Sequence, residues 1–253
     1  MGRKEQMKEK MKEKAEKHTA IMEELYSKEI NKSIAETRIY RTDFVRSSTA
    51  GSVAEFLLEQ SYTQDSIMRN AGKEKVAVLN FASYRHAGGG FINGAIAQEE
   101  AICHASFLYN VLREFQDYYE WNESHYNMGL YTNRALYSPE VFFFSDEYQN
   151  HVSADVITCA APNRSTLHRN GRVSELDNET ALKDRIRFIR DICDTESVDI
   201  LIAGAFGCGV FAQNPEVVAA YFRDFFSDTK VKKVVFAVPP DRNYYAFEKE
   251  FPR

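Results

Sequence analysis

Apolar residues in this chain occur in short, compact runs separated by longer segments that carry a single apolar stripe. The runs are rich in Val, Ile and Phe and are too short for typical helices, so they predict buried strands. These strands are expected at residues 76–82, 141–144, 155–160, 198–203 and 234–238. Because helical segments alternate with them, the pattern predicts an α/β fold, with a mixed or parallel central sheet covered by helices on both faces.

Helices are predicted from apolar spacing and from capping residues. Ile186, Ile189 and Ile192 fall on one stripe, and Asn214 followed by Pro215 is typical of a helix start. Ser52 is a candidate cap for a short helix that turns Val53, Phe56 and Leu57 inward. The predicted helices span residues 52–60, 95–115, 180–193 and 215–226.

Residues 1–36 predict one long, highly charged helix, because Lys, Glu, Met and Ala dominate there. Its apolar positions, Ile21, Leu25 and Ile30, begin only in the second half. We interpret it as a solvated helix whose later turns pack on the domain, with a partner-binding or nucleic-acid-binding arm as the alternative. The predicted organisation is an N-terminal helical extension over 1–36 and one further domain over 37–253.

Composition narrows the classes of protein that remain. The 253 residues are 44% hydrophobic and carry a net charge of −5, which disfavours a partner such as duplex nucleic acid. The four cysteines form no CxxC pair, which argues against a zinc ribbon or a redox dithiol. The basic start has no apolar stretch behind it, and no run is long enough to span a bilayer, so we expect a cytoplasmic protein with no membrane partner.

The first unusual loop follows the strand predicted at 76–82. Gly88, Gly89 and Gly90 are consecutive, which lets a ligand approach the main chain closely and leaves backbone N–H groups free for phosphate or ribose oxygens. Gln98, Glu99 and Glu100 come next, at a predicted helix start. An acidic pair at a helix start is ordinarily explained by the helix dipole alone. Only the combination of this pair with the glycine triplet indicates a catalytic site.

The second unusual loop, 204–211, also follows a buried strand and leads to a helix. Its glycines do not fit the dinucleotide fingerprint, so a Rossmann site is disfavoured. Cys208 lies between Gly207 and Gly209, but no histidine partner for a nucleophilic thiol is identifiable from residue order. No metal-ligand spacing is present either, and we expect neither a metal nor a cofactor.

The triplet GGG, seven further residues and then QEE resemble the signature of poly(ADP-ribose) glycohydrolases, specifically their bacterial-type branch. Family members commonly carry Pro where this chain has Ala87, a departure that would loosen the start of the loop without touching the chemistry. Further segments resemble that branch in the same order, namely 78–83, 136–139, 159–163 and 204–211. The resemblance covers residues 37–251.

This resemblance implies a macrodomain-like fold that binds the terminal ADP-ribose unit of a polymer. Glu100 takes the catalytic position, Glu99 holds a ribose hydroxyl, and Gln98 helps to fix the site. The other residues that it implies would contact the ribose, the diphosphate and the adenine, with a tether of the loop as the alternative role of Asn80. They are Asn80, Ser83, Gly88, Gly89, Gly90, Gly207, Cys208, Gly209, Val210 and Phe211. The implied partners are poly(ADP-ribose) or ADP-ribosylated proteins, with ADP-ribose as the product, in the response to DNA damage.

The chemistry is consistent with a single acid/base. Adjacent helical residues diverge by about 100°, so Glu99 and Glu100 are a poor pair for clamping one glycosidic bond from opposite sides. Glu100 is therefore expected to protonate the leaving ribose oxygen and then to accept a proton from water, with an oxocarbenium ion between the two steps. Two alternatives remain open: a module that only binds ADP-ribose, and a hydrolase of mono(ADP-ribosyl) protein links.

Overall fold

The computed structural model describes residues 2–44, 46, 51–72, 74–146, 148, 150–166 and 173–252. Its centre is a seven-stranded sheet with the strand order β1-β4-β5-β3-β6-β7-β2. The strands are β1 (Arg38–Tyr40), β2 (Glu55–Glu59), β3 (Val76–Phe81), β4 (Ala135–Asp146), β5 (Asn150–Cys159), β6 (Ile200–Ala203) and β7 (Lys233–Ala237). The predicted α/β class with a mixed sheet is confirmed.

The sheet is parallel through its middle and antiparallel at one side. β3 pairs in parallel with both β5 and β6, β6 with β7, and β7 with the edge strand β2. β4 runs antiparallel to β5 and to β1. The carboxyl ends of β5, β3 and β6 therefore meet at one edge of the sheet, where ligands bind in folds of this kind.

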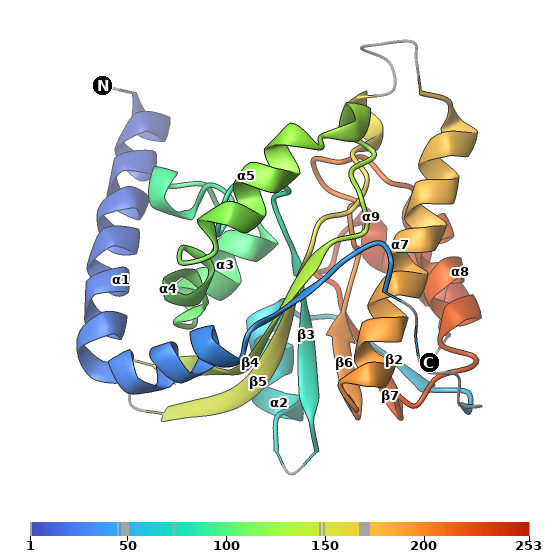
Figure 1. Cartoon of the computed structure of the whole chain (residues 1–253), viewed down its shortest axis with the longest axis horizontal. Coiled ribbons are helices and arrows are strands. Elements are labelled where there is room, and N and C mark those ends of the chain that lie inside the picture. The colour runs from blue at the N-terminus through green and yellow to red at the C-terminus, as the bar shows by residue number, and fades with distance from the viewer. Residues whose placement is uncertain are drawn as a thin grey trace.

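Helices cover both faces of the sheet (Figure 1). They are α1 (Arg3–Glu36), α2 (Thr63–Asn70), α3 (Gln98–His104), α4 (Leu108–Leu112), α5 (Gln116–Ser124), α7 (Glu175–Thr195), α8 (Pro215–Phe225) and α9 (Arg242–Glu250), with short 3-10 turns at 91–93, 127–129 and 164–166. None of the helices in the described residues is both long and apolar enough to cross a membrane.

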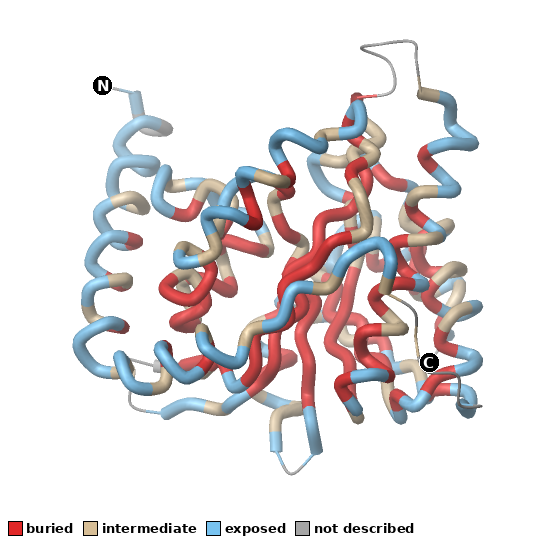
Figure 2. Tube along the Cα trace, viewed as in Figure 1, coloured by how far each residue is buried: buried red, intermediate tan, exposed pale blue. Residues whose placement is uncertain are grey.

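The sheet separates two hydrophobic cores, because successive side chains of a strand point to opposite faces. On β3, Ala77 and Leu79 pack with α7, α8 and α9, whereas Val76 and Val78 pack with α1 to α5. β6 is buried along its whole length, and β3 and β7 are buried except for one end residue each, Phe81 and Lys233, as the red segments of Figure 2 show. Continuous burial on both faces explains why these strands read as unbroken apolar runs.

The helix predicted at 52–60 is wrong, and the segment instead contains β2. Ala54 and Leu58 are buried while Val53 and Leu57 are exposed, an alternation with a period of two. Ser52 does not cap a helix but forms an isolated bridge with Thr229. Hydrogen bonds to β7 decide the conformation here, and such a long-range partner is not visible in the local sequence.

The single helix predicted at 95–115 is also wrong, because it is divided into α3 and α4. The break falls at Ser106, which bridges Phe143 of β4, and the N–H of Phe144 donates to the carbonyl of Ala105. The side-chain hydroxyl of Ser106 donates to the carbonyl of Ile102 and caps the broken end. Elements β1, α2, α5 and α9 lie where none was predicted.

The predicted N-terminal helix is confirmed as α1, which kinks at Tyr26. Ala15, Met22 and Ile30 are buried in the core shared with α3 and α4. Leu25 is exposed, so not every apolar position in the second half of α1 packs on the domain. The first half of α1 also contacts the domain, because the main chain at Lys8 lies directly against Gly94 in the loop that precedes α3.

Replacing Gly94 with alanine tests this contact between α1 and the loop. Gly94 has a φ of +75°, and an added Cβ would collide with the Lys8 carbonyl. We expect Gly94→Ala to lower the free energy of unfolding in urea by about 1–3 kcal/mol. Gly72→Ala is the matched control, since a Cβ there meets nothing within 4 Å. Equal stabilities of the two variants would contradict the contact.

Candidate functional site

Two loops lie side by side at the carboxyl edge of the sheet. The loop after β3 leads to α3, which packs on one face, whereas the loop after β6 leads to α8, which packs on the other face. Because β3 and β6 are neighbours, a crevice opens where the two chain paths separate. The two glycine-containing loops singled out in the sequence are therefore brought together.

In the first loop, Gly89 is pressed directly against both glutamates of the QEE triplet. Its φ is +61°, and a Cβ added there would lie 2.6 Å from Oε1 of Glu100 and 2.8 Å from Oε2 of Glu99. A side chain of any size is excluded from this position, both by the left-handed backbone and by the two carboxyl groups. Gly88 has a φ of +64°, and a Cβ added there would lie 2.8 Å from the ring of Tyr109.

Both glutamates are buried and held by backbone N–H groups. Glu100 accepts hydrogen bonds from Gly90 N–H at Oε1 (2.8 Å) and from Ala97 N–H at Oε2 (2.9 Å). Glu99 accepts from Ser83 N–H (2.7 Å) and from the side-chain amide of Asn80 (3.1 Å). The loop thus fixes both side chains in place before any ligand arrives.

Glu99 holds a proton far more strongly than an ordinary carboxyl group. Burial raises its pKa to about 8, and the hydrogen bonds from Ser83 and Asn80 offset only part of this effect. The neighbouring Glu100 carboxylate raises the pKa further. Near neutral pH Glu99 therefore keeps its proton.

The side chains of Asn80 and Gln98 form hydrogen bonds within the protein, where they hold Glu99 and the start of α3 in place. Asn80 is fully buried and donates to Glu99 and to the hydroxyl of Thr158 on β5. Gln98 accepts from Phe81 N–H (2.9 Å) and donates to the carbonyl of Leu79 (3.0 Å), which ties the start of α3 to β3. One side of Gln98 still borders the cavity described below.

The second loop presents its main chain, not its cysteine, to the crevice. Cys208 is buried, and burial raises the pKa of its thiol to about 12, so the thiol is not a nucleophile at neutral pH. Among the described residues, nothing accepts a hydrogen bond from the N–H groups of Gly209, Val210 and Phe211. Val210 is 83% exposed and a Cβ at Gly209 would meet nothing, so this turn is open to a ligand.

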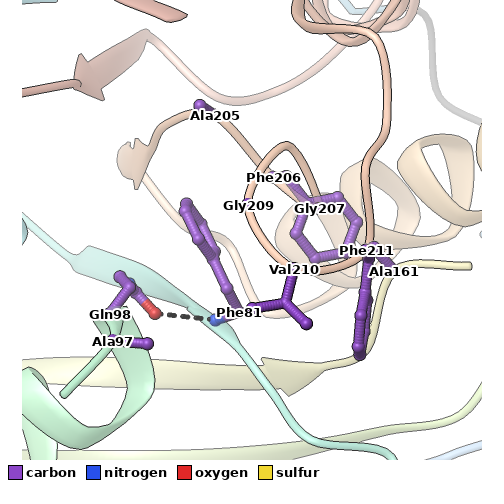
Figure 3. A pocket seen from close by; sticks show the side chains of 10 residues that line it. All are labelled: Phe81, Ala97, Gln98, Ala161, Ala205, Phe206, Gly207, Gly209, Val210 and Phe211. Carbon is purple, nitrogen blue, oxygen red and sulfur yellow. Dashed lines mark hydrogen bonds between the residues drawn. The ribbon is translucent and has the colours of Figure 1, made fainter. Parts of the chain in front are cut away.

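A cavity of about 170 Å³ separates the two loops. Figure 3 shows Ala97 and Gln98 of the first loop on one side, the turn from Gly207 to Phe211 on the other, and Phe81 of β3 between them. Phe211 forms an edge contact with Tyr131, with ring centroids 6.0 Å apart, which holds the end of this turn.

A larger cavity of about 540 Å³ adjoins the first one. Both are lined by Phe81, Gln98 and Gly209, so together they form a continuous cleft along the carboxyl edge of the sheet. The far wall of the larger cavity comes from α2 and from the segment after β7, including Thr63 and Pro239. The cleft therefore extends from Phe211, which lines only the smaller cavity, to Thr63 and Pro239, which line only the larger one.

Two expectations about the first loop need correction. The N–H groups of Gly89 and Gly90 are not free for phosphate, because they donate to the carbonyl of His86 and to Glu100. Adjacent helical positions do diverge, but the long side chains of Glu99 and Glu100 bend back so that both carboxyl groups meet Gly89. In the part of the chain that the structure describes, the N–H groups without an acceptor that face the cleft belong to the second loop, at Gly209, Val210 and Phe211.

Some residues that line the cleft were not predicted. Phe81 and Ala161 follow from the rule that ligands lie beyond the carboxyl ends of strands, since they are at the ends of β3 and β5. Thr63 could not be found in this way, because helix α2 was not predicted. Ser83 contributes its N–H to Glu99, while its hydroxyl accepts from the N–H groups of Arg85 and His86.

The raised pKa of Glu99 predicts how stability depends on pH. The folded protein keeps this proton up to about pH 8, whereas the unfolded chain loses it near the ordinary value of 4.5. The contribution of Glu99 to stability therefore falls as the pH rises from 4.5 to 8. In Glu99→Gln this fall is absent, so the Tm of the variant relative to wild type should rise by several degrees between pH 5 and pH 8.

Glu24→Gln is the control, because Glu24 is exposed on α1. Thermal unfolding followed by circular dichroism at several pH values measures both differences. Curves for Glu99→Gln and wild type that stay parallel across this range would show that Glu99 is ionised in the folded protein.

Comparison with known proteins agrees with this geometry. A family model described as microbial-type PARG, catalytic domain, matches residues 6–146. A comparison with curated protein sequences gave no match. Two similar solved structures come from Thermomonospora curvata and Deinococcus radiodurans.

The poly(ADP-ribose) glycohydrolase (PARG) of Thermomonospora curvata superposes with a TM-score of 0.84 and 26% identity, over 96% of this chain and 100% of that one. The Deinococcus radiodurans PARG in complex with ADP-ribose gives a TM-score of 0.79 and 28% identity, over 88% of this chain and 97% of that one. Because the family model covers more than half of the sequence, this chain belongs to the microbial-type poly(ADP-ribose) glycohydrolase (PARG) catalytic-domain family.

Proposed function

We propose that this protein hydrolyses the ribose–ribose O-glycosidic bond of poly(ADP-ribose) and releases ADP-ribose. The observation that supports this most directly is the pair of buried carboxyl groups at Glu99 and Glu100. They follow Gln98, which lines a cleft where the N–H groups of Gly209, Val210 and Phe211 donate to none of the described residues. The Deinococcus radiodurans relative is solved with ADP-ribose bound, which agrees with a ligand of this class. A protein that only binds ADP-ribose has no need of two buried carboxyl groups at a glycine contact.

The terminal ADP-ribose unit would lie along the cleft between the two glycine loops. Its diphosphate would accept hydrogen bonds from the N–H groups of Gly209, Val210 and Phe211, which suit an anion even though the protein is acidic overall. The adenosine part would occupy the larger cavity beside Phe81 and Thr63. The distal ribose would then reach Gly89 and the glutamates, with the ring of Phe211 against one of its faces.

Glu100 is proposed as the acid and the base of the reaction. As a carboxylic acid it donates a proton to the oxygen of the leaving ribose, the bond from that oxygen to the anomeric carbon breaks, and an oxocarbenium ion forms. Water attacks the anomeric carbon, and its proton returns to Glu100. The diphosphate of the ligand stabilises the positive charge between the two steps.

Glu99 is the neighbouring carboxyl group at this site. Because burial raises the pKa of Glu99 to about 8, Glu99 itself keeps a proton at neutral pH, and the two carboxyl groups meet at Gly89. Glu99 would also accept a hydrogen bond from a ribose hydroxyl and orient the sugar. A glutamate pair on adjacent residues does not span a bond from opposite sides, which favours this scheme over a covalent glycosyl intermediate.

The reaction is tested by incubating the purified protein with labelled poly(ADP-ribose) and, separately, with a mono(ADP-ribosyl)ated protein. We expect the polymer to shorten with release of free ADP-ribose. Loss of only the protein-linked unit would instead identify a mono(ADP-ribosyl) hydrolase. Tight binding of polymer without any product would identify a binding module.

Glu100→Gln tests the assigned residue. Gln keeps the size of the side chain and an acceptor for Gly90 N–H, but it cannot give a proton to the leaving oxygen. We expect the rate of ADP-ribose release to fall by about 10²–10⁴-fold, with ADP-ribose affinity by calorimetry within a few-fold of wild type. Glu24→Gln, at an exposed position on α1, is the control for charge removal. Turnover of Glu100→Gln at the wild-type rate would refute the assignment.

A further inference from the structure

Residues 207–213 of the second loop form a closed turn, which we call turn 207–213. The N–H of Gln213 donates to the carbonyl of Gly207 (3.0 Å), and the N–H of Ala212 donates to the carbonyl of Gly209 (3.0 Å). The three N–H groups that donate to none of the described residues belong to the segment that the first of these bonds encloses. The turn is therefore closed by its own main chain on the side away from those donors.

Two residues that follow β5 hold the turn from outside. The N–H of Ser165 donates to the carbonyl of Phe211 (3.3 Å), and the guanidinium of Arg164 donates to the carbonyl of Ala212 (3.1 Å). The same guanidinium pairs with Glu175 at the start of α7 (2.9 Å). The carbonyl groups of the turn are thus bonded to the protein, so its peptide units cannot rotate to present oxygen atoms to an anion in the cleft.

A pair of buried side-chain amides, Asn178 and Gln213, ties the turn to α7, and we call it the amide pair. Nε2 of Gln213 donates to Oδ1 of Asn178 (2.8 Å) and to the carbonyl of Pro162 (2.7 Å). Nδ2 of Asn178 donates in return to Oε1 of Gln213 (3.1 Å). Each residue is only 4% exposed, and neither lines the cleft, so the amide pair acts from behind the turn.

The side chain of Gln213 packs directly against the start of the turn. Gly207 has a φ of +75°, and a Cβ added there would lie 2.9 Å from Cγ of Gln213 and 2.7 Å from Cβ of Ala161. Gln213 therefore holds Gly207 both by contact and by the hydrogen bond from its N–H. Because the amide of Gln213 is hydrogen-bonded at both ends, its side chain is fixed, and the backbone at both ends of the turn is fixed with it.

We propose that the amide pair is a positioning element for the ligand's diphosphate, which holds turn 207–213 with its unpaired N–H groups toward the cleft. This inference rests on the proposed function, because it takes the ligand to be an ADP-ribosyl group. N–H groups that are already oriented bind an anion without first being ordered, which strengthens binding. Helix α7 thereby contributes to substrate affinity, although none of its residues lines the cleft.

Asn178→Ala tests the amide pair with two ligands that share an adenosine group. ADP-ribose carries the diphosphate and adenosine does not. The quantity measured is the ratio of the Kd of ADP-ribose to the Kd of adenosine, from titrations followed by NMR. We expect this ratio to rise by about three- to tenfold, the effect of one hydrogen bond. Asn178→Leu keeps the volume without the hydrogen bonds, should raise the ratio similarly, and replaces Asn178→Ala if that variant does not fold.

Gln213→Leu removes the other half of the amide pair and should raise the ratio at least as far. The double variant Asn178→Ala/Gln213→Leu should raise it no further than Gln213→Leu alone, because two residues that act as one unit are not additive. Fully additive effects would show that the two amides act separately, which contradicts the inference.

Asn110→Ala is the matched control, since Asn110 is a buried asparagine of α4 whose amide donates to the carbonyl of Thr19 on α1 (3.0 Å). It should lower the Tm and leave the ratio at the wild-type value. A lower Tm of Asn178→Ala with both Kd values unchanged, or an equal rise in both, overturns the inference and leaves the proposed function intact. If the folded wild-type protein does not bind ADP-ribose, the proposed function fails and this inference fails with it.

Discussion

The contact between Gly89 and the two carboxyl groups is the constraint on which the site depends. Because position 89 has no side chain and a positive φ, the loop can lie flat on the start of α3 and direct backbone N–H groups at the glutamates. That cover removes the carboxyl groups from water, and removal from water raises the pKa of Glu99. Geometry, burial and proton affinity at this site thus share one cause.

Much of the fold could be predicted because buried parallel strands leave a strong local pattern. The runs that form β3, β6 and β7 were found since both of their faces are apolar. The errors occur where a distant partner decides the conformation. β2 is a strand because it pairs with β7, and the break at Ser106 exists because this residue bridges β4. Neither partner is visible in the sequence close to these segments.

The site was predictable to a similar extent and for a similar reason. Glycine and acidic residues at loop positions pointed to both loops, and parallel pairing of β3 with β6 explains why the loops meet. Which polar atoms of the first loop remain free could not be predicted, since that depends on the folded hydrogen bonds. Gly89 and Gly90 use their N–H groups internally, whereas those of Gly209, Val210 and Phe211 in the second loop donate to none of the described residues. Cys208 is likewise a loop residue whose thiol points into the core.

The position of α1 against Gly94 has a consequence for the chain as a whole. Lys8 and Gly94 are far apart in sequence, yet the carbonyl of one fills the space that a side chain on the other would need. The first helix therefore acts as an outer support for the loop that carries the QEE triplet, and the chain's beginning and its reactive centre are mechanically joined. A tag, a truncation or a binding partner that displaces this helix would therefore also displace the carboxyl pair, without touching the cleft.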